Sequence, residues 1–436
     1  MNLNFSINLY NITRKTLIYA ILLIVVATAG CNFSNKSALH DSKGITPNQF
    51  EGTDTERIQA AVDKAVESSG RVIIPADNSN GTNIWLLDNA ILLPGDITVI
   101  LDNCIIQLSD SCRDNMFRSK NVGEGIVNPG WNKNISIIGI GEATLKGAAN
   151  PRSTGDGGKK LSLNPDADIE ASGDWRISYG TDAGKADRKH TGDWRNILIL
   201  MAYVDGFKLK NVNIENTHAW AVSHERVINA ELSNIRINNP ERSTINGKSQ
   251  LVRNRDGINL RHGCKNFRID NISGKTGDDF VALSTLGLYS EHSEGGTLNS
   301  TMVTSRKWHG PEDDTENVYI TNLVCESATR AVAIRANDVA GISQVYVNGV
   351  IFEGGYNALL VGGRGYGRNS QPGKINNVHA MNIMGDGRSL IQIEEPIANC
   401  SFINGLYRGD GDEVVLYVND KKETTNVIVD GITVMK

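Results

Sequence analysis

Cysteine is scarce in this chain of 436 residues: six are present, and no two of them have the CxxC spacing. The sequence therefore carries neither a zinc-binding signature nor a disulfide framework, and we expect no structural metal. Four of the six lie in or beside apolar runs of strand-like character, which predicts small buried side chains. They are Cys104, Cys264, Cys325 and Cys400.

Proline is also in short supply, and basic residues do not outnumber acidic ones. There are 10 prolines against 44 glycines, and with 40% apolar and 21% charged residues the composition excludes disorder, collagen and a membrane-spanning bundle. The 49 acidic and 44 basic side chains leave a net charge of −5, and the basic residues are scattered. Because phosphate recognition needs clustered Lys and Arg, this balance argues against a nucleic-acid partner.

The segment 1–31 has the features of an export signal. Arg14 and Lys15 precede an apolar run at 16–30, which is short for a membrane span. Its end, Thr28-Ala29-Gly30-Cys31, resembles the bacterial lipoprotein signal, although Leu is usual where Thr28 stands. An uncleaved anchor or a simple secretory peptide is the alternative. We predict a signal at 1–31, a lipid on Cys31 as the membrane contact, a polar tether at 32–46, and a place in the periplasm or at the outer membrane or surface of a bacterium.

One amphipathic helix is predicted near the start of the folded part. It opens at Asp54 and ends by Gly70, before a strand at 72–75. Its apolar face consists of Ile58, Ala61, Val62 and Ala65.

Beyond this helix, a short phrase of the pattern apolar-x-apolar-x-x-apolar, with Asn, Asp or Gly inside it, recurs along the chain. The copies lie at 207–212, 231–235, 267–272, 318–323, 345–350, 378–383, 402–406 and 427–432. The step in sequence number is 232 − 209 = 23 from Leu209 to Leu232, and 405 − 382 = 23 from Asn382 to Gly405. Strand-like units at this period predict a parallel β-solenoid, with Asn and Gly at tight turns. Leucine-rich repeats share the period, but their Leu-rich consensus is missing.

Further strand-like segments at 97–101 and 135–140 extend the solenoid upstream. The predicted fold class is therefore all-β: a single-stranded parallel β-helix with an N-terminal capping helix, forming one domain at 47–436, which we expect to be a monomer. Two long stretches break the period, at 148–192 and 285–316. Such excursions from a rigid scaffold commonly wall a binding cleft; the alternative is a disordered decoration.

Carboxylates gather in two turn-like segments. Asp256 lies in the first, and Asp278 and Asp279 lie in the second, so that Asp256 and Asp278 are separated by 278 − 256 = 22 in sequence number, about one coil. In a parallel solenoid these side chains converge on one face, and crowded acids favour protonation of one while its neighbour stays ionised, as acid–base catalysis requires. A calcium site built from the same carboxylates is the alternative chemistry.

Asn254-Arg255-Asp256 and Gly277-Asp278-Asp279 resemble the Asn-x-Asp and Gly-Asp-Asp motifs of the polygalacturonase-type glycoside hydrolases, family 28, of the pectin-lyase-like superfamily. The helix and first strand are similar to the N-terminal cap of that superfamily, so the resemblance covers about 46–436. It implies a right-handed β-helix in which Asp278 is the general acid, and Asp256 and Asp279 activate water. The implied reaction proceeds with inversion and without a cofactor.

The sequence departs from the family at two further motifs. Thr329-Arg330-Ala331 stands where the family has Gly-His-Gly, and Leu360-Val361-Gly362 stands where it has Arg-Ile-Lys, the motif that holds the substrate carboxylate. A different register would let Ile334-Arg335 represent that second motif and would place His309-Gly310 near the missing His. We favour the first register, because it preserves the apolar phrase on both sides. Arg330 and Arg335 are therefore predicted to bind an anionic sugar through bidentate contacts. His224, at a strand end upstream of Asp256, is a third predicted substrate-binding residue; a structural histidine is its alternative.

Three functions fit these residues. We expect a glycosidase that cleaves an acidic, uronate-containing polysaccharide or oligosaccharide without a cofactor. A polysaccharide lyase is the first alternative, with Arg330 as the base and Ca²⁺ on the uronate carboxylate. A non-catalytic glycan-binding lipoprotein is the second.

Overall fold

The computed structural model describes residues 44–123, 126, 129–151, 154–155, 158–160, 189–191, 194–285, 303, 310–336, 340–364 and 371–435. Ile45–Lys436 forms one compact unit. The export signal, Cys31 and most of the tether at 32–46 lie outside the described residues, as do large parts of both predicted excursions. Among the helices that the structure describes, none has the length and hydrophobicity that a membrane crossing requires.

The N-terminal end of the coil stack is covered by η1 (Pro47–Gln49) and α2 (Asp54–Val66). A capping box starts α2: the Thr53 hydroxyl accepts from the Glu56 backbone, and the Glu56 carboxylate accepts from the Thr53 backbone. The predicted apolar face is buried against the first coil, which confirms the capping helix. This face consists of Ile58, Ala61, Val62 and Ala65.

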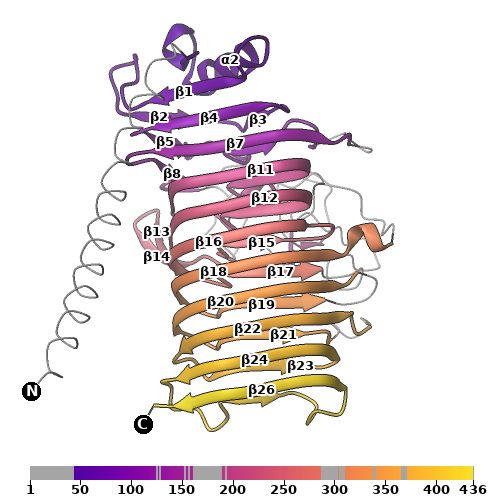
Figure 1. Ribbon diagram of the computed structural model, residues 1–436. Helices are drawn as coiled ribbons and strands as arrows, with labels where there is room; N and C mark the ends of the chain where they lie inside the picture. Colours follow the sequence, from indigo (N-terminus) through magenta and orange to yellow (C-terminus); the bar gives the residue numbers. More distant parts are fainter. Residues whose placement is uncertain are drawn as a thin grey trace, which may run out of the picture. The chain divides into compact units, whose positions relative to one another are not determined.

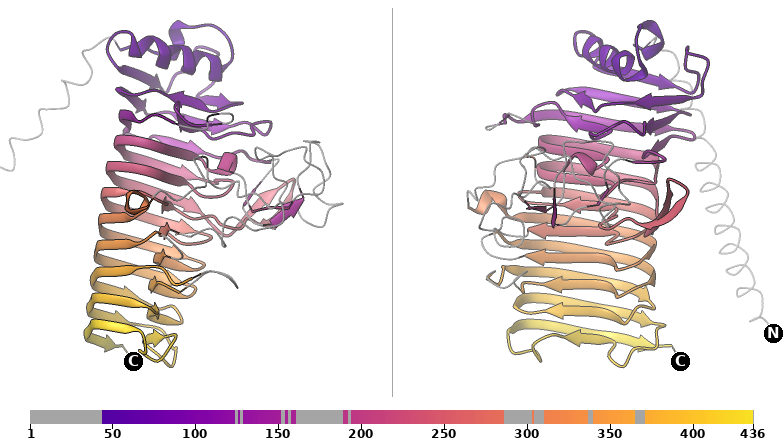
Figure 2. Two further views of the ribbon diagram at one scale, coloured as in Figure 1. Left: turned by 90° about the vertical axis from the view of Figure 1, so that its right-hand side faces the viewer. Right: turned by 180° about the vertical axis from the view of Figure 1, so that it is seen from behind.

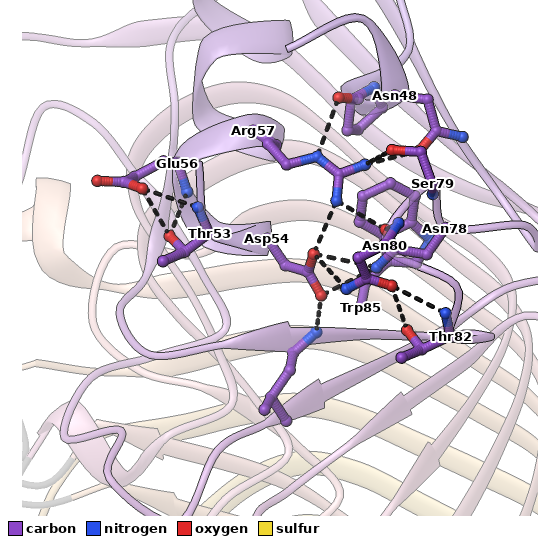
Figure 3. A network of polar contacts seen from close by, with 12 residues as sticks. Asn48, Thr53, Asp54, Glu56, Arg57, Asn78, Ser79, Asn80, Thr82 and Trp85 are labelled. Atoms are coloured by element: carbon purple, nitrogen blue, oxygen red, sulfur yellow. Dashed lines mark hydrogen bonds and ion pairs between the residues drawn. The ribbon is translucent and has the colours of Figure 1, made fainter. Parts of the chain in front are cut away.

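A buried polar network ties α2 to the first coil (Figure 3). Arg57 pairs with Asp54 at 3.1 Å and donates to Asn78 Oδ1 at 2.7 Å. Its guanidinium also lies 4.9 Å from the centre of the Trp85 ring. Asp54 in turn accepts from the backbone N–H of Leu86 at 2.8 Å. Because both charges are buried and hydrogen-bonded, they fix the position of the cap instead of destabilising it.

Within the described residues, 22 strands form one continuous parallel sheet that winds into a β-helix, with the coils stacked one upon another (Figures 1 and 2). The strands line up in three ladders. Ladder 1 contains β3 (Ile91–Leu93), β6 (Phe117–Ser119), β15 (Ile258–Leu260), β17 (Val281–Thr285), β19 (Arg330–Ala336), β21 (Asn357–Gly362), β23 (Ser389–Glu394) and β25 (Val415–Tyr417).

Ladder 2 starts with β1 (Arg71–Pro75), β4 (Ile97–Asp102) and β7 (Asn132–Ile140). Its later strands are longer, and they turn a corner and continue into ladder 3. These are β16 (Lys265–Thr276), β18 (Thr315–Ser327), β20 (Ile342–Gly354), β22 (Ile375–Gly385), β24 (Ile397–Tyr407) and β26 (Thr424–Val434). Ladder 3 starts with β2 (Ile84–Leu87), β5 (Ile105–Leu108) and β8 (Thr144–Lys146). Two strands, β11 (Ile199–Glu215) and β12 (Val222–Asn239), run through all three ladders.

Four short strands and two single turns lie outside this sheet. They are the antiparallel pairs β9 (Gly158–Lys160) with β10 (Lys189–Thr191) and β13 (Arg242–Ile245) with β14 (Lys248–Leu251), and the turns η2 (Trp194–Asn196) and η3 (Pro311–Asp313). Both antiparallel pairs project from the stack, so the described core is the β-helix itself.

The strand register confirms the predicted parallel β-helix. Leu209 pairs with Leu232, and this coil advances by 232 − 209 = 23. The predicted equivalence of Asn382 with Gly405 is wrong by one position, because Ile383 is the partner of Gly405 and this coil advances by 405 − 383 = 22. Coil length is therefore set locally, by the residues at each corner.

Asparagine makes the corner between ladders 2 and 3. Asn211, Asn234 and Asn271 have φ of 57°, 56° and 55°, the left-handed conformation that Asn tolerates better than most residues. Their side chains form a ladder along the stack: Asn271 donates to Asn234 at 2.8 Å, and Asn234 donates to Asn211 at 2.9 Å. The interior Asn of the repeated phrase is thus explained by both backbone geometry and hydrogen bonding between coils.

The cysteines of the described region are buried thiols, as predicted. Burial raises the pKa of Cys104 and Cys264 to about 12, which keeps them as small apolar side chains. Alternate residues of each strand fill the interior with Ile, Val, Leu and Phe, so the core runs the length of the stack.

Candidate active site

The predicted catalytic residues meet where the strands of ladder 1 begin. Asp256 precedes β15, Asp279 precedes β17, and Arg330 is the first residue of β19. The backbone N–H of Gly257 donates to Asp279 O at 3.0 Å, and that of Phe280 donates to Arg330 O at 2.9 Å. Since Ile258 pairs with Val281, Asp256 has Asp279 as its neighbour in the next coil. The expectation that Asp278 stands in register with Asp256 is off by one position, because this coil advances by 281 − 258 = 23.

Asp279 and Arg330 form an ion pair, with Nη1 at 3.0 Å from Oδ1 and both side chains largely buried. Burial lowers the pKa of Arg330, but the carboxylates of Asp279, Asp278 and Glu394 outweigh burial and raise the pKa above its usual value. Arg330 therefore stays a cation in its pair with Asp279.

Asp278 has different surroundings, although it is the next residue in the chain. Its Oδ1 accepts from the backbone N–H of Asp279 at 3.0 Å. The hydroxyl of Thr329 lies 2.9 Å from Oδ1 of Asp278 and 2.9 Å from Oδ1 of Asp279. Two neighbouring carboxyl groups thus share one hydroxyl, while Arg330 contacts Asp279.

Contacts of the residues on either side of Asp256 in the chain, Arg255 and Asn259, hold it in place. Its Oδ2 accepts from Asn259 Nδ2 on β15 at 3.2 Å. The preceding Arg255 is buried and anchors the segment by donating to Thr217 O and Pro240 O, each at 2.7 Å. Burial lowers the pKa of Arg255 to about 9. These contacts fix the turn that carries Asp256 before any substrate binds.

The two predicted substrate-binding arginines both contact carboxylates. Arg335, on β19, lies two coils from Glu394 on β23, with Gly362 of β21 between them. Arg335 Nη2 is 3.2 Å from Glu394 Oε1, and Gln392 Nε2 donates to the same oxygen at 2.8 Å. A Cβ on Gly362 would lie 2.7 Å from the Glu394 Cβ, so the pair occupies the space above that glycine.

His224 lies in the core instead of facing the candidate site, and its prediction as a substrate-binding residue is wrong. It is fully buried on the inward side of β12, where its ring lies 5.5 Å from Phe207 and 5.1 Å from Phe267. Its Nδ1 is 2.9 Å from Asn259 O, and burial lowers its pKa to about 4. The side chain alternates with outward-facing Ser223 and therefore points into the core, as a structural histidine.

The pairing of strands supports the first of the two registers that the sequence left open, because β19 pairs directly with β17 and the coil of Arg330 therefore follows that of Asp278 and Asp279. Ala333 of β19 pairs with Leu360, and Arg335 pairs with Gly362. Leu360-Val361-Gly362 therefore lies in the coil after Arg330, and Ile334-Arg335 lies in the same coil as Arg330. His309, the other residue of the second register, lies outside the described residues.

No grouping of three or more His, Cys, Asp or Glu side chains in the described part of the chain has the arrangement of a metal site. The described geometry at Asp256, Asp278 and Asp279 is that of separately held carboxyl groups, two of which share a hydroxyl. Several carboxyl groups at one place are what acid–base hydrolysis of a glycosidic bond needs.

Residues 154–354 match the family model of glycosyl hydrolases family 28. This match supports a glycosidase. The matched segment contains Asp256, Asp278, Asp279, Arg330 and Arg335, and it ends before β21 and β23. The resemblance to family 28 that the motifs indicated is thereby confirmed, and no curated protein sequence matches this chain.

Solved structures with this fold come from proteins of different function. An endo-xylogalacturonan hydrolase from Aspergillus tubingensis has 13% identity and a TM-score of 0.54, with 88% of this chain and 89% of that chain covered. PfbA, a surface adhesin of Streptococcus pneumoniae, has 10% identity and a TM-score of 0.50, with 90% and 84% covered. A tailspike protein of E. coli bacteriophage HK620 has 12% identity and a TM-score of 0.52, with 88% and 63% covered. At these identities the likeness shows the fold alone.

Thr329 and Glu394 belong to the candidate site but were not singled out from the sequence. The Thr329 hydroxyl contacts Asp278, which lies 51 residues earlier in the chain because a long excursion separates the two coils. Glu394 lies beyond the matched segment and reaches the site through two coils of stacking. The coil period would identify both, once the length of the excursion between β17 and β18 is known.

Proposed function

We propose that this protein hydrolyses a glycosidic bond in an acidic, uronate-containing polysaccharide or oligosaccharide, with inversion at the anomeric carbon. The observation that carries the proposal is the grouping of three carboxyl groups where neighbouring strands begin. Asp256 and Asp279 occupy equivalent positions in successive coils, Asp278 directly precedes Asp279 in the chain, and Arg330 lies 3.0 Å from Asp279. Carboxyl groups gathered in this way can supply an acid and a base.

In this mechanism Asp278 donates its proton to the leaving glycosidic oxygen. Asp279 or Asp256 takes a proton from a water molecule, whose oxygen forms the new bond to the anomeric carbon as the bond to the leaving group breaks. Attack from the opposite face of the ring gives inversion. No step requires a cofactor.

The charge state of Arg330 weighs against the lyase alternative. A base in β-elimination must accept a proton from the carbon next to the uronate carboxylate, so its guanidine must be neutral. The carboxylates around Arg330 raise its pKa and hold it as a cation. Arg330 is better suited to stabilise Asp279 or to contact a substrate carboxylate.

A panel of uronate-containing glycans of plant, algal and animal type tests the proposal. Reducing ends and the ultraviolet absorbance of unsaturated uronate are recorded together, with and without a chelator. New reducing ends without that absorbance are expected. Strong absorbance that a chelator abolishes would instead establish the lyase.

The variant Asp278→Asn separates an enzyme from a glycan-binding protein. Loss of a general acid is expected to lower the rate about 10²–10⁴-fold while binding of the glycan persists. Asp430→Asn, a change of the same kind at an exposed residue of the last coil, is the matched control and should leave the rate unchanged. Absence of turnover in the wild-type protein on every glycan that it binds would favour the binding protein.

We also propose that the chain is exported, is lipidated on Cys31 and acts as a monomer in the periplasm or at the cell surface. The sequence at 28–31 supports this. Metabolic labelling with a fatty-acid analogue, compared between the wild type and Cys31→Ser, tests the lipid, and light scattering of the soluble protein tests the monomer.

A further inference from the structure

Arg388 is an exposed arginine that lies against an aromatic ring next to the candidate site. It comes directly before β23, and its guanidinium lies 4.3 Å from the centre of the Tyr356 ring. The guanidinium of Arg330, which pairs with Asp279, lies 5.7 Å from the centre of the same ring. The ring therefore links Arg388 to the group of charges at the site, and the cation–π contact keeps the exposed guanidinium near it.

Strand pairing explains why these side chains meet. In ladder 1, β19 pairs with β21, and β21 pairs with β23. Tyr356 comes directly before β21 and Arg388 directly before β23, so the two occupy equivalent places in consecutive coils. Asp279 comes directly before β17, three coils before Arg388. Because neighbouring parallel strands lie about 4.8 Å apart, the backbone of Arg388 is about 14 Å from that of Asp279 along the stack.

The backbone that carries Arg388 is fixed before any substrate binds. The hydroxyl of the buried Tyr407 lies 2.8 Å from Gly387 O and 3.2 Å from Arg388 O. The N–H of Ser389 donates to Tyr356 O at 3.2 Å. Since the turn is anchored to the coils on both sides of it, a ligand would have to order only the end of the Arg388 side chain, which lowers the entropic cost of binding.

Arg388 also differs in its charge balance from the two arginines that the sequence predicted as substrate ligands. Arg330 and Arg335 each pair with a carboxylate. Within the described part of the chain, no carboxylate lies at ion-pair distance from Arg388. The acid nearest to it in the sequence, Asp386, instead accepts from Gly354 N–H at 2.9 Å. A carboxylate on a ligand would therefore meet Arg388 without competing with a carboxylate already paired to it.

We propose that Arg388 binds the carboxylate of a uronate sugar of the substrate, and that Tyr356 holds the guanidinium in place for this contact. The inference rests on the proposed function, for which it specifies where the acidity of the glycan is recognised. A planar guanidinium presents two N–H groups to a carboxylate in a bidentate contact, and it does so while one of its faces stays on an aromatic ring. The three coils between Arg388 and Asp279 place this contact on a sugar further along the glycan than the cleaved bond.

The variant Arg388→Gln tests the inference through binding instead of turnover. Isothermal titration in an Asp278→Asn background compares a uronate oligosaccharide with the same oligosaccharide after reduction of its carboxyl groups. We expect roughly a 10-fold loss of affinity for the uronate form and little change for the reduced form. Salt should weaken uronate binding less than in the wild type, since one ion pair is gone. Arg388→Lys keeps the charge but loses the planar set of N–H groups, so it should recover only part of the affinity.

Arg236→Gln is the matched control, because Arg236 is an exposed arginine on ladder 3. It makes the same change of charge and should leave both affinities unchanged. No loss in Arg388→Gln, an equal loss for both oligosaccharides, or a loss that Arg236→Gln reproduces would overturn the inference.

A double-mutant cycle tests the role of Tyr356. If the ring acts by holding Arg388, Tyr356→Leu should lower uronate affinity less in the Arg388→Gln protein than in the protein with Arg388 intact. Equal losses in the two proteins would reject the holding role of Tyr356.

Turnover separates a failure of this inference from a failure of the proposed function. In the protein with Asp278 intact, Arg388→Gln should raise KM for the uronate glycan and change kcat little, because the contact is present before and during the reaction. Hydrolysis of a uronate glycan with the same KM in the wild type and in Arg388→Gln would leave the proposed function in place and reject the role of Arg388. Neither binding nor hydrolysis of any uronate glycan by the wild-type protein would reject both.

Discussion

The pair formed by Arg335 and Glu394 allows a sharp prediction about substrate charge. The side chains are 18% and 14% exposed, and 3.2 Å separates Nη2 from Oε1. A uronate carboxylate at this place would meet a positive and a negative charge together, whose effects largely cancel. Glu394→Gln keeps an oxygen that can accept from Arg335 and removes the negative charge. The variant should therefore bind anionic sugars more tightly than the wild type.

The size of the effect follows from the geometry. Two unit charges about 4 Å apart interact by about 4 kcal/mol at the effective dielectric of a partly buried site. Desolvation of the substrate carboxylate offsets most of this, which leaves about 1–2 kcal/mol, or roughly a 10-fold decrease in Kd. The gain should shrink as salt is raised from low ionic strength, because screening weakens partly exposed charges.

Isothermal titration with a uronate oligosaccharide and a neutral oligosaccharide of the same length is the assay, in an Asp278→Asn background that prevents turnover. Glu353→Gln is the matched control, since Glu353 is 66% exposed and lies 3.9 Å from Arg408. The reasoning is refuted if Glu394→Gln leaves the affinity for the uronate unchanged, or improves both oligosaccharides equally. Either result would remove Arg335 from the substrate site.

Two further predictions concern the scaffold. Gly257→Ala would place a Cβ 2.3 Å from Phe280 O, between the coils of Asp256 and Asp279. We therefore expect a loss of more than about 2 kcal/mol in the free energy of unfolding and a large loss of activity. Gly130→Ala is the control because the space around Gly130 is open, and equal denaturation midpoints for the two variants would contradict the strand register. His224 is neutral in the folded state because burial lowers its pKa to about 4 from 6.5, so the unfolded chain binds the extra proton and stability falls as the pH drops from about 6.5 toward 4. In urea titrations at several pH values, His224→Gln should remove up to about 3 kcal/mol of the stability that the wild type loses between pH 6.5 and 4. The same loss in both proteins would count against a neutral buried His224.

Much of the fold could be predicted because the solenoid repeats its physical constraints in every coil. Asparagine at the corner, an apolar residue at each inward position and a nearly constant coil length identify both the strands and their partners, as Leu209 and Leu232 illustrate. The exception at Asn382 arose because one missing residue in a corner changes the step without changing the pattern of apolar residues. Local coil length is a property of three-dimensional packing that the repeat alone does not encode.

The grouping of the three candidate carboxyl groups could be predicted for the same reason, but their partners could not. Asp256, Asp278 and Asp279 occupy turn positions one coil apart, where stacking is enough to bring them together. His224 stands on a strand whose residues alternate inward and outward, and a shift of one residue decides between core and cleft. Arg335 looked like a substrate ligand because its counter-charge, Glu394, comes from a coil 59 residues later in the chain.

The division of labour between Asp278 and Asp279 is the central claim, and its most direct test compares two leaving groups. The rate of hydrolysis of the glycan is compared with that of an aryl glycoside of the same sugar. The aryl group leaves as a phenolate and does not need a proton from a general acid. Asp278→Asn should lose about 10²-fold or more on the glycan and much less on the aryl glycoside, whereas Asp279→Asn should be impaired on both. Equal losses on the two substrates for Asp278→Asn would contradict its assignment as the general acid.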